Sequence, residues 1–212
     1  MFFNSKKDFS FTLAFKIFNN HNALEKTLSS LEKSNLLSNL KILFVDFCST
    51  ELEVKKILLN FVKKYNNEYY ILLVKKKSNE AQIDNYFHVV SELKNFDSDY
   101  YVFLDDNCDF LPEWLYTLKY LISMQLDLND KFFTLRDVYH YECQIRPNLI
   151  ESHDTFNVYR SIKKSGFAIS KNQLEKISSF IPNNNFYDYL NWNFDDNTKI
   201  IGPKNNLIND LY

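Results

Sequence analysis

Two patterns of apolar residues alternate along the first 122 positions of the chain. Short continuous apolar runs, rich in aromatic and β-branched side chains, predict buried strands at residues 11–18, 40–45, 69–74 and 100–104. Longer segments with one apolar stripe at helical spacing predict amphipathic helices at residues 21–33, 51–65, 80–93 and 112–122. Because strands and helices alternate, we expect parallel βαβ units and an α/β fold with a mostly parallel central sheet.

The pattern changes from residue 131 onward. We expect an extended element at 131–141, one or two short strands within 156–170, a short helix at 172–179 and a strand at 199–201. The sequence contains no internal repeat and no linker. A single domain formed by residues 1–212 is therefore expected.

Composition narrows the range of functions. The chain has 212 residues and a net charge of −2, which provides no overall attraction for nucleic acid. Its two glycines, Gly166 and Gly202, do not form the glycine-rich loop that cradles phosphate in P-loop or dinucleotide-binding proteins. The three cysteines lack metal-ligand spacing and form an odd set, so we expect a reducing, cytoplasmic location. The N-terminal segment, which carries Lys6, Lys7 and Lys16, matches neither a signal peptide nor a membrane span.

Side chains that carry oxygen stand where three of the expected strands end. These residues are Asn19 after the first strand, Asp46 after the second, and Asp105, Asp106 and Asn107 after the fourth. In an open parallel sheet the carboxyl ends of the strands lie at one edge, where ligands bind. Carboxylate and amide oxygens at such an edge suit Mg²⁺ or Mn²⁺ that holds a diphosphate. The simpler alternative is an acidic loop that caps the following helix.

Five segments, in this order along the chain, resemble motifs of the family 2 glycosyltransferases, which have the GT-A fold. They are residues 16–20, 23–31, 44–50, 78–85 and 105–115. The last segment, with Asp105-Asp106-Asn107, then Pro112 and Trp114-Leu115, is similar to the family's metal-binding Asp-x-Asp motif. Residues 165–171, 186–190 and 201–209 extend the resemblance into the second half of the chain.

The resemblance implies a GT-A-like, or Rossmann-like, three-layer sandwich with residues 1–122 as the nucleotide-binding half and residues 123–212 as the acceptor-binding half. It also implies transfer of a sugar from a nucleotide-diphosphate sugar to an acceptor hydroxyl, with inversion and with the help of Mn²⁺ or Mg²⁺. A UDP-sugar is the first choice of donor. The acceptor could be a glycan, a lipid-linked sugar, a protein or a modified nucleobase.

The resemblance further assigns roles to individual side chains. The nucleotide-binding residues would be Asn19, Asp46, Asn85, Asp105 and Asp106. The metal ligands would be Asp105 and Asn107. Asp188 would be the general base that takes the proton of the acceptor, and Asp154 is its alternative.

Several positions depart from the family pattern, including Phe47, which follows Asp46 where an acid is common, and the surroundings of residues 48 and 80, where the usual glycines are absent. Asn107 stands where the motif has its second Asp, and Asn209 stands near the place where the family often has a His. An amide oxygen can coordinate a divalent cation but brings no charge, so weaker metal binding is expected. Two alternatives stay open: a GT-A domain that serves as a non-catalytic binding or scaffolding module, and a nucleotidyltransferase, against which the missing glycine-rich loop counts.

Overall fold

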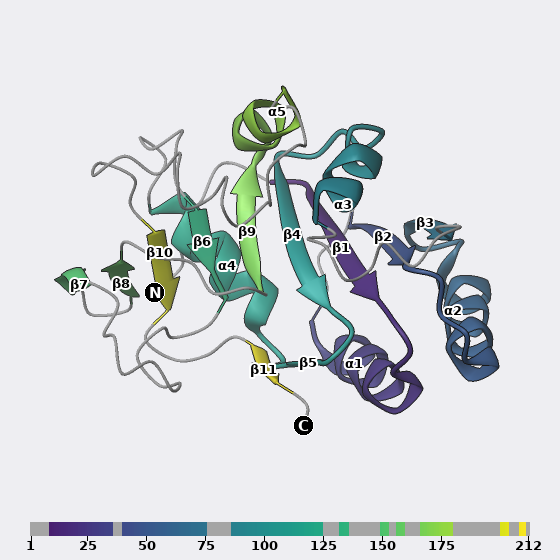
Figure 1. Cartoon of the computed structure of the whole chain (residues 1–212). Coiled ribbons are helices and arrows are strands. Elements are labelled where there is room, and N and C mark those ends of the chain that lie inside the picture. Colours follow the sequence, from purple (N-terminus) through teal and green to yellow (C-terminus); the bar gives the residue numbers. More distant parts are fainter. Residues whose placement is uncertain are drawn as a thin grey trace.

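The structure is a computed structural model of the chain and describes residues 9–35, 40–75, 86–124, 132–135, 149–152, 156–159, 166–179, 200–203 and 208–210. Figure 1 shows a large central sheet with helices packed on both of its faces. Within the described residues, no helix is both long enough and apolar enough to span a membrane.

The first half of the chain contains all eight elements that its apolar pattern predicts. Their bounds are β1 Phe11–Ile17, α1 His21–Lys33, β2 Lys41–Asp46, α2 Leu52–Tyr65, β3 Tyr70–Lys75, α3 Tyr86–Leu93, β4 Tyr100–Asp105 and α4 Trp114–Ser123. Residues 80–85 of the helix expected at 80–93 lie outside the described residues. An additional short strand, β5 Cys108–Phe110, follows β4 and was not predicted.

The described parts of the second half are mainly short strands. Its elements are β6 Phe132–Thr134, β7 Leu149–Ser152, β8 Phe156–Tyr159, β9 Phe167–Ser170, α5 Lys171–Ser179, β10 Ile200–Pro203 and β11 Ile208–Asp210. The two strands within 156–170, the short helix and the strand near 200 are confirmed. The element expected at 131–141 is a strand over three residues, and 136–141 lie outside the described residues. β7 and β11 were not predicted.

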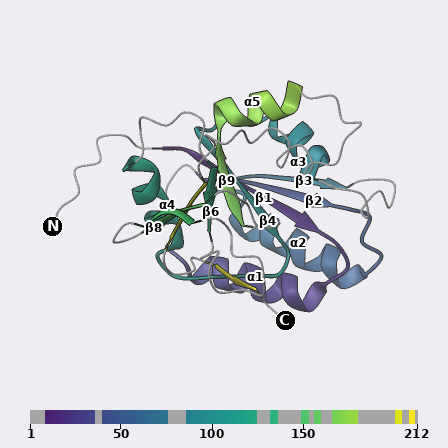
Figure 2. The ribbon, with the colours of Figure 1, turned by 60° about the vertical axis from the view of Figure 1, so that its left-hand side comes forward.

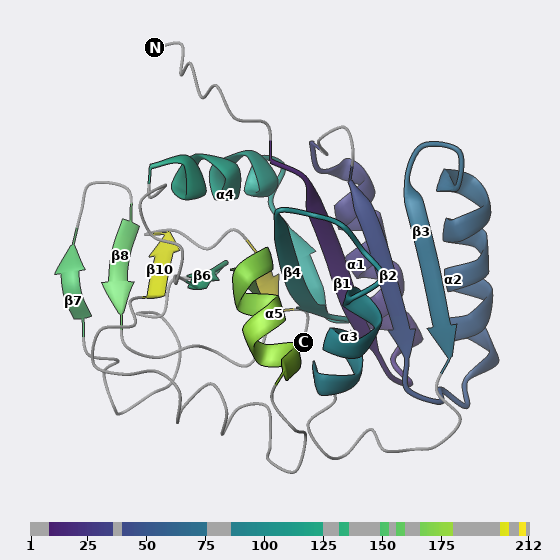
Figure 3. The same cartoon turned by 90° about the horizontal axis from the view of Figure 1, so that it is seen from above.

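Within the part of the chain that the structure describes, nine strands form the main sheet, in the order β3-β2-β1-β4-β9-β6-β10-β8-β7. Figure 3 shows β3 at one end of this row and β7 at the other. β1 lies between β2 and β4 and is parallel to both. The strand pairings make β8 and β9 the reversed strands, while the other seven run in one direction. The expectation of a mostly parallel central sheet is therefore confirmed.

Each face of the sheet has its own apolar core, because the strand residues alternate between the two faces. One face carries residues such as Phe15 and Phe44, which pack with α1, α2 and α4. The other face carries residues such as Leu43 and Phe103, which pack with α3 and α5. Figure 2 shows α1 and α2 on one side of the sheet and α3 and α5 on the other. Helices on both faces explain why the central strands are almost continuously apolar, and they make the expected three-layer sandwich.

Parallel strands bring their carboxyl ends to one edge of the sheet. In the β1–β2 ladder Ile17 lies opposite Asp46, and in the β1–β4 ladder Lys16 lies opposite Asp105. The ends of β1, β2 and β4 are therefore neighbours. This edge carries the polar residues that the sequence marks as candidates for a binding site.

Candidate functional site

The loop after β1 turns sharply at Asn19. Its backbone φ angle is 46°, in the left-handed region, where asparagine is better tolerated than most residues. The next residue, Asn20, is the N-cap of α1, and its side-chain oxygen accepts a hydrogen bond from the backbone N–H of Ala23 at 3.1 Å. The two asparagines thus form the turn that leads from the sheet edge into the first helix.

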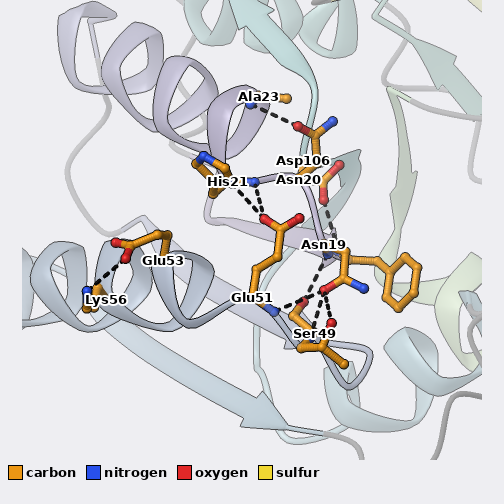
Figure 4. Close-up of polar contacts among 11 residues, drawn as sticks. Asn19, Asn20, His21, Ala23, Ser49, Glu51, Glu53, Lys56 and Asp106 are labelled. Carbon is orange, nitrogen blue, oxygen red and sulfur yellow. Dashed lines mark hydrogen bonds and ion pairs between the residues drawn. The ribbon is translucent and has the colours of Figure 1, made fainter.

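The Asn19 side chain connects this turn to the loop between β2 and α2, as Figure 4 shows. Its Oδ1 accepts hydrogen bonds from the backbone N–H of Thr50 at 2.7 Å and of Glu51 at 3.3 Å. The Thr50 hydroxyl donates to the same oxygen at 3.3 Å, and the Asn19 N–H donates to Ser49 Oγ at 3.1 Å. Because Oδ1 is occupied by the protein, Asn19 would meet a ligand through its Nδ2 donor.

Asp46 ends β2 and is almost fully buried, with 5% of its surface exposed. Its Oδ1 accepts the backbone N–H of Ser49 at 2.8 Å, which closes a local turn of the kind that aspartate favours. The N–H of the following residue, Phe47, donates to the carbonyl of Ile17 at 3.0 Å. Cys48, inside the turn, has a φ of 61°. The carboxylate is thus held next to the end of β1, beside the Asn19 loop.

An unpredicted pair, His21 and Glu51, joins the starts of α1 and α2. His21 Nδ1 lies 2.7 Å from Glu51 Oε2, and the same oxygen accepts the His21 backbone N–H at 3.4 Å (Figure 4). The hydrogen bond from the His21 side chain lowers the pKa of Glu51 below its ordinary value. No motif marks these two residues, because they are 30 positions apart in the sequence and meet only through the fold.

Asp105 is the last residue of β4 and forms an ion pair across the sheet. Lys16 Nζ lies 3.0 Å from Asp105 Oδ1, and 31% and 22% of the respective side chains are exposed. The only signal for this pair in the sequence is the single lysine that interrupts the apolar run of the first strand. Its partner becomes apparent from the β1–β4 register, which places the two residues opposite each other.

Asp106 holds the loop after β1 and helix α1 against the end of β4. Its Oδ2 accepts the backbone N–H of Phe18 at 2.9 Å, and its carbonyl accepts the Thr27 hydroxyl at 2.9 Å. Burial raises the pKa of Asp106 to about 6, and the neighbouring Asp105 charge adds to the rise. The sequence predicts a nucleotide contact for this carboxyl group, and the structure adds a local structural role.

Asn107 carries a buried polar atom that lacks a partner. Its Oδ1 is shielded from solvent and makes no hydrogen bond. Burying an amide oxygen in this way is unfavourable unless a ligand satisfies it. A divalent cation is such a ligand, and Mg²⁺ or Mn²⁺ is commonly held by one or two protein oxygens together with phosphate oxygens and water. Asp105 and Asn107 therefore fit the protein's share of such a site, although the described residues contain no group of three or more His, Cys, Asp or Glu that could hold a metal.

The C-terminal strand lies beside this motif. β11 pairs antiparallel with β5, with Asn209 opposite Asp109 and Asp210 opposite Cys108. The backbone of Asn209, which stands near the position of the family's His, therefore lies close to the Asp105–Asn107 turn. Roughly a hundred positions separate the paired strands, so this proximity is a product of the fold.

Three residues of the sequence prediction are not covered. Asn85, Asp154 and Asp188 lie outside the described residues, and their roles stay predictions. The structure brings the other predicted site residues, Asn19, Asp46, Asp105, Asp106 and Asn107, together at the carboxyl edge of β1, β2 and β4.

A cavity of about 850 Å³ lies elsewhere, between α1, α2 and the turn after β5. Its lining includes Ser29, Phe61 and Phe110 but none of Asn19, Asp46 and Asp105. This cavity is on the face of the sheet that α1 and α2 cover, and its lining contains none of these three candidate site residues.

No protein-family model matches the chain, and no curated protein matches it. Solved structures do resemble it. GalNAc-T7 with UDP, GalNAc and Mn²⁺ superposes with a TM-score of 0.72 at 13% identity, over 96% of this chain and 43% of that one. S. aureus TarS gives a TM-score of 0.67 at 13% identity, over 96% of this chain and 37% of that one. A mannosyltransferase from Pyrobaculum calidifontis, PcManGT with GDP-Man and Mn²⁺, gives 0.50 at 14% identity, over 60% of this chain and 35% of that one.

The chain spans less than half the length of these three structures. At 13–14% identity the likeness concerns the fold. The neighbours are glycosyltransferases of the GT-A type, so the expected GT-A-like fold is confirmed, while membership of family 2 stays a prediction.

Proposed function

We propose that this chain is a glycosyltransferase that moves a sugar from a nucleotide-diphosphate sugar to an acceptor hydroxyl, with inversion and with divalent-metal assistance. The observation that carries the proposal is the buried, unpartnered Oδ1 of Asn107 two positions after Asp105, at the carboxyl edge of a GT-A-like sheet. Two oxygen donors so close in sequence, one of them without a protein partner, are suited to a cation that bridges to phosphate.

The nucleoside would bind at the ends of β1 and β2. Asp46 is buried there, and its Oδ1 accepts the Ser49 N–H. A carboxylate has two acceptor oxygens, so Oδ2 would accept a hydrogen bond from the nucleobase. Asn19 would donate from Nδ2, since Oδ1 is used by Thr50 and Glu51. Fixing the nucleoside in this way positions the sugar for attack, which accounts for much of the rate of a transfer reaction. Asn85 would add a further contact.

At the other end of the donor, Asp105 and Asn107 would hold Mn²⁺ or Mg²⁺, which when bound neutralises the departing diphosphate. Asp188 would accept the proton of the acceptor hydroxyl, with Asp154 as the alternative base. Residues 1–122 would then bind the nucleotide and residues 123–212 the acceptor, within a single domain. The structure of GalNAc-T7 contains UDP and that of PcManGT contains GDP-Man, and UDP is our first choice for this chain.

A second candidate function is a binding module without catalysis. It is favoured by the neutral Asn107 in the metal motif and by the ion pair that already occupies Asp105. Both features reduce the net negative charge that a divalent cation would meet. The two functions differ in whether a bound donor is turned over.

The first experiment is a titration of the purified chain with UDP, GDP and dTDP, with Mn²⁺ and with EDTA, followed by calorimetry and thermal unfolding. Binding of one nucleotide should raise the melting temperature by mass action. If no nucleotide binds under any condition, the proposed function is wrong. If one binds, release of that nucleotide from its UDP- or GDP-sugar, measured with a panel of acceptors, separates a transferase from a binding module.

A further inference from the structure

Lys16 is an unusual residue for its position. It lies near the carboxyl end of β1, a central strand with buried neighbours on both sides, and it is the only residue of β1 that is partly exposed. A lysine in such a strand loses hydration and is normally kept only where its ammonium has an anionic partner. That partner is Asp105, with Nζ 3.0 Å from Oδ1.

The pair shares its carboxylate with the candidate metal site. Asp105 is the only formally charged member of the Asp105–Asn107 donor pair, because Asn107 is neutral. A divalent cation at Asp105 would therefore be added to a carboxylate that already carries a hydrogen-bonded ammonium, and the two positive charges repel. Metal binding and the Lys16–Asp105 contact are thus opposed.

The same geometry gives the ammonium a second use. An ammonium has three N–H donors, so one lysine can bind a carboxylate oxygen and a ligand's anionic oxygen at the same time. Its side chain is about one third exposed, at 31%, and lies at the edge of the sheet that carries the candidate site. A lysine is a common point charge for phosphate in proteins.

We infer that Lys16 is a diphosphate-binding residue that shares Asp105 with the divalent cation and supports nucleotide binding when no metal is present. The inference rests on the proposed function, since it concerns the same nucleotide. It differs from the metal-assisted scheme in one measurable respect: part of the positive charge that neutralises the diphosphate comes from Lys16 and not from the metal.

The test is UDP binding by calorimetry, in EDTA and in Mn²⁺, for the wild type and for Lys16→Met. Methionine keeps the length of the side chain and is compatible with the buried strand. In EDTA the wild type should bind UDP and Lys16→Met should bind it about 10-fold more weakly or worse, the scale of one lost hydrogen bond between charged groups. Lys16→Arg, which keeps the charge, should retain binding.

A second measurement is Mn²⁺ binding to the nucleotide-free protein, followed by electron paramagnetic resonance. Lys16→Met should bind Mn²⁺ more tightly than the wild type, because the competing ammonium is gone. A purely structural role for Lys16 would not produce this opposite change. The matched control is Lys56→Met, which removes an exposed lysine that pairs with Glu53 on α2 at 2.8 Å and should change neither affinity.

The results separate this inference from the proposed function. If no nucleotide binds even with Mn²⁺, both are wrong. If the wild type binds UDP with Mn²⁺ but not in EDTA, or if Lys16→Met binds UDP in EDTA as well as the wild type does, Lys16 is not a diphosphate ligand while the proposed function survives. Should Lys16→Met fail to fold, Lys16→Gln replaces it: this variant also removes the charge and should weaken UDP binding in EDTA, and wild-type UDP affinity in this variant would overturn the inference.

Discussion

Replacement of Asn19 by alanine should destabilise the protein, because one side chain holds two loops together. The variant removes the acceptor of the Thr50 and Glu51 backbone N–H groups. It also places alanine at a φ of 46°, which disfavours a residue with a Cβ by roughly 1 kcal/mol. Each lost hydrogen bond contributes about 0.5–1.5 kcal/mol, and water replaces part of the bond to Thr50, which is exposed. We expect a total loss of about 2–3 kcal/mol.

Asn19→Gly separates the two causes. Glycine accepts the positive φ without strain, so this variant should lose only the hydrogen bonds and be about 1 kcal/mol more stable than Asn19→Ala. Asn20→Ala is the matched control, since it removes a single capping bond to Ala23 and should lose about 1 kcal/mol. Urea unfolding at neutral pH, followed by circular dichroism, measures all three. Equal stabilities of the alanine and glycine variants at position 19 would refute the backbone argument, and wild-type stability in both would refute the role of the side chain.

Three further predictions concern titration and packing. The pKa of Asp106 is about 6 in the folded protein against an ordinary 3.8, so between these values the folded state keeps a proton that the unfolded state loses, and stability should fall as pH rises from about 4 to 6. Urea unfolding at several pH values measures this slope, and Asp106→Asn should flatten it. An unchanged slope in the variant would contradict the raised pKa of Asp106. His21→Ala should raise the pKa of Glu51 toward its ordinary value, because the His21 hydrogen bond is the main cause of its lowering. Carboxyl NMR titration measures this pKa, and an unchanged value in the variant would mean that the two residues do not pair in solution. Trp114→Ala should cost about 3–5 kcal/mol, since the ring is fully buried against Phe110 with centroids 4.9 Å apart; a loss below 1 kcal/mol in urea would contradict this packing.

The first half of the fold was predictable because its signals are local. Apolar runs such as residues 100–104 and helical stripes such as residues 21–33 persist over enough positions to define both the type and the extent of an element. Parallel alternation then places Asp46 and Asp105 at one edge of the sheet, as the β1–β2 and β1–β4 ladders confirm. For these residues sequence reasoning led to the correct region of the molecule.

What the sequence could not reveal depends on contacts between distant segments. β5 and β11 are three residues each, too short for a periodic signal, and stabilise each other only because the chain returns to the same place. Lys16 is visible as a lysine in an apolar run, but its partner follows only from the register of β1 and β4. Asn19 and Asp106 were predicted as nucleotide contacts; the structure adds that both also hold the β1 loop, through bonds to residues 31 and 88 positions away.

The last prediction concerns Asp188 and follows from the proposal that different residues act on the donor and on the acceptor. In the proposed mechanism the general base would act on the acceptor hydroxyl and Asp105 would act on the donor diphosphate, so loss of each should have a different effect. Asp188→Asn should leave UDP affinity nearly unchanged and lower turnover by roughly 10²–10⁴-fold, the usual scale for a missing general base. Asp105→Ala should weaken nucleotide and Mn²⁺ binding together. Calorimetry and nucleotide release, measured on both variants, distinguish these effects. Unchanged turnover in Asp188→Asn would exclude it from the mechanism and make Asp154 the residue to replace next, whereas loss of UDP binding in the same variant would mean that Asp188 contacts the donor.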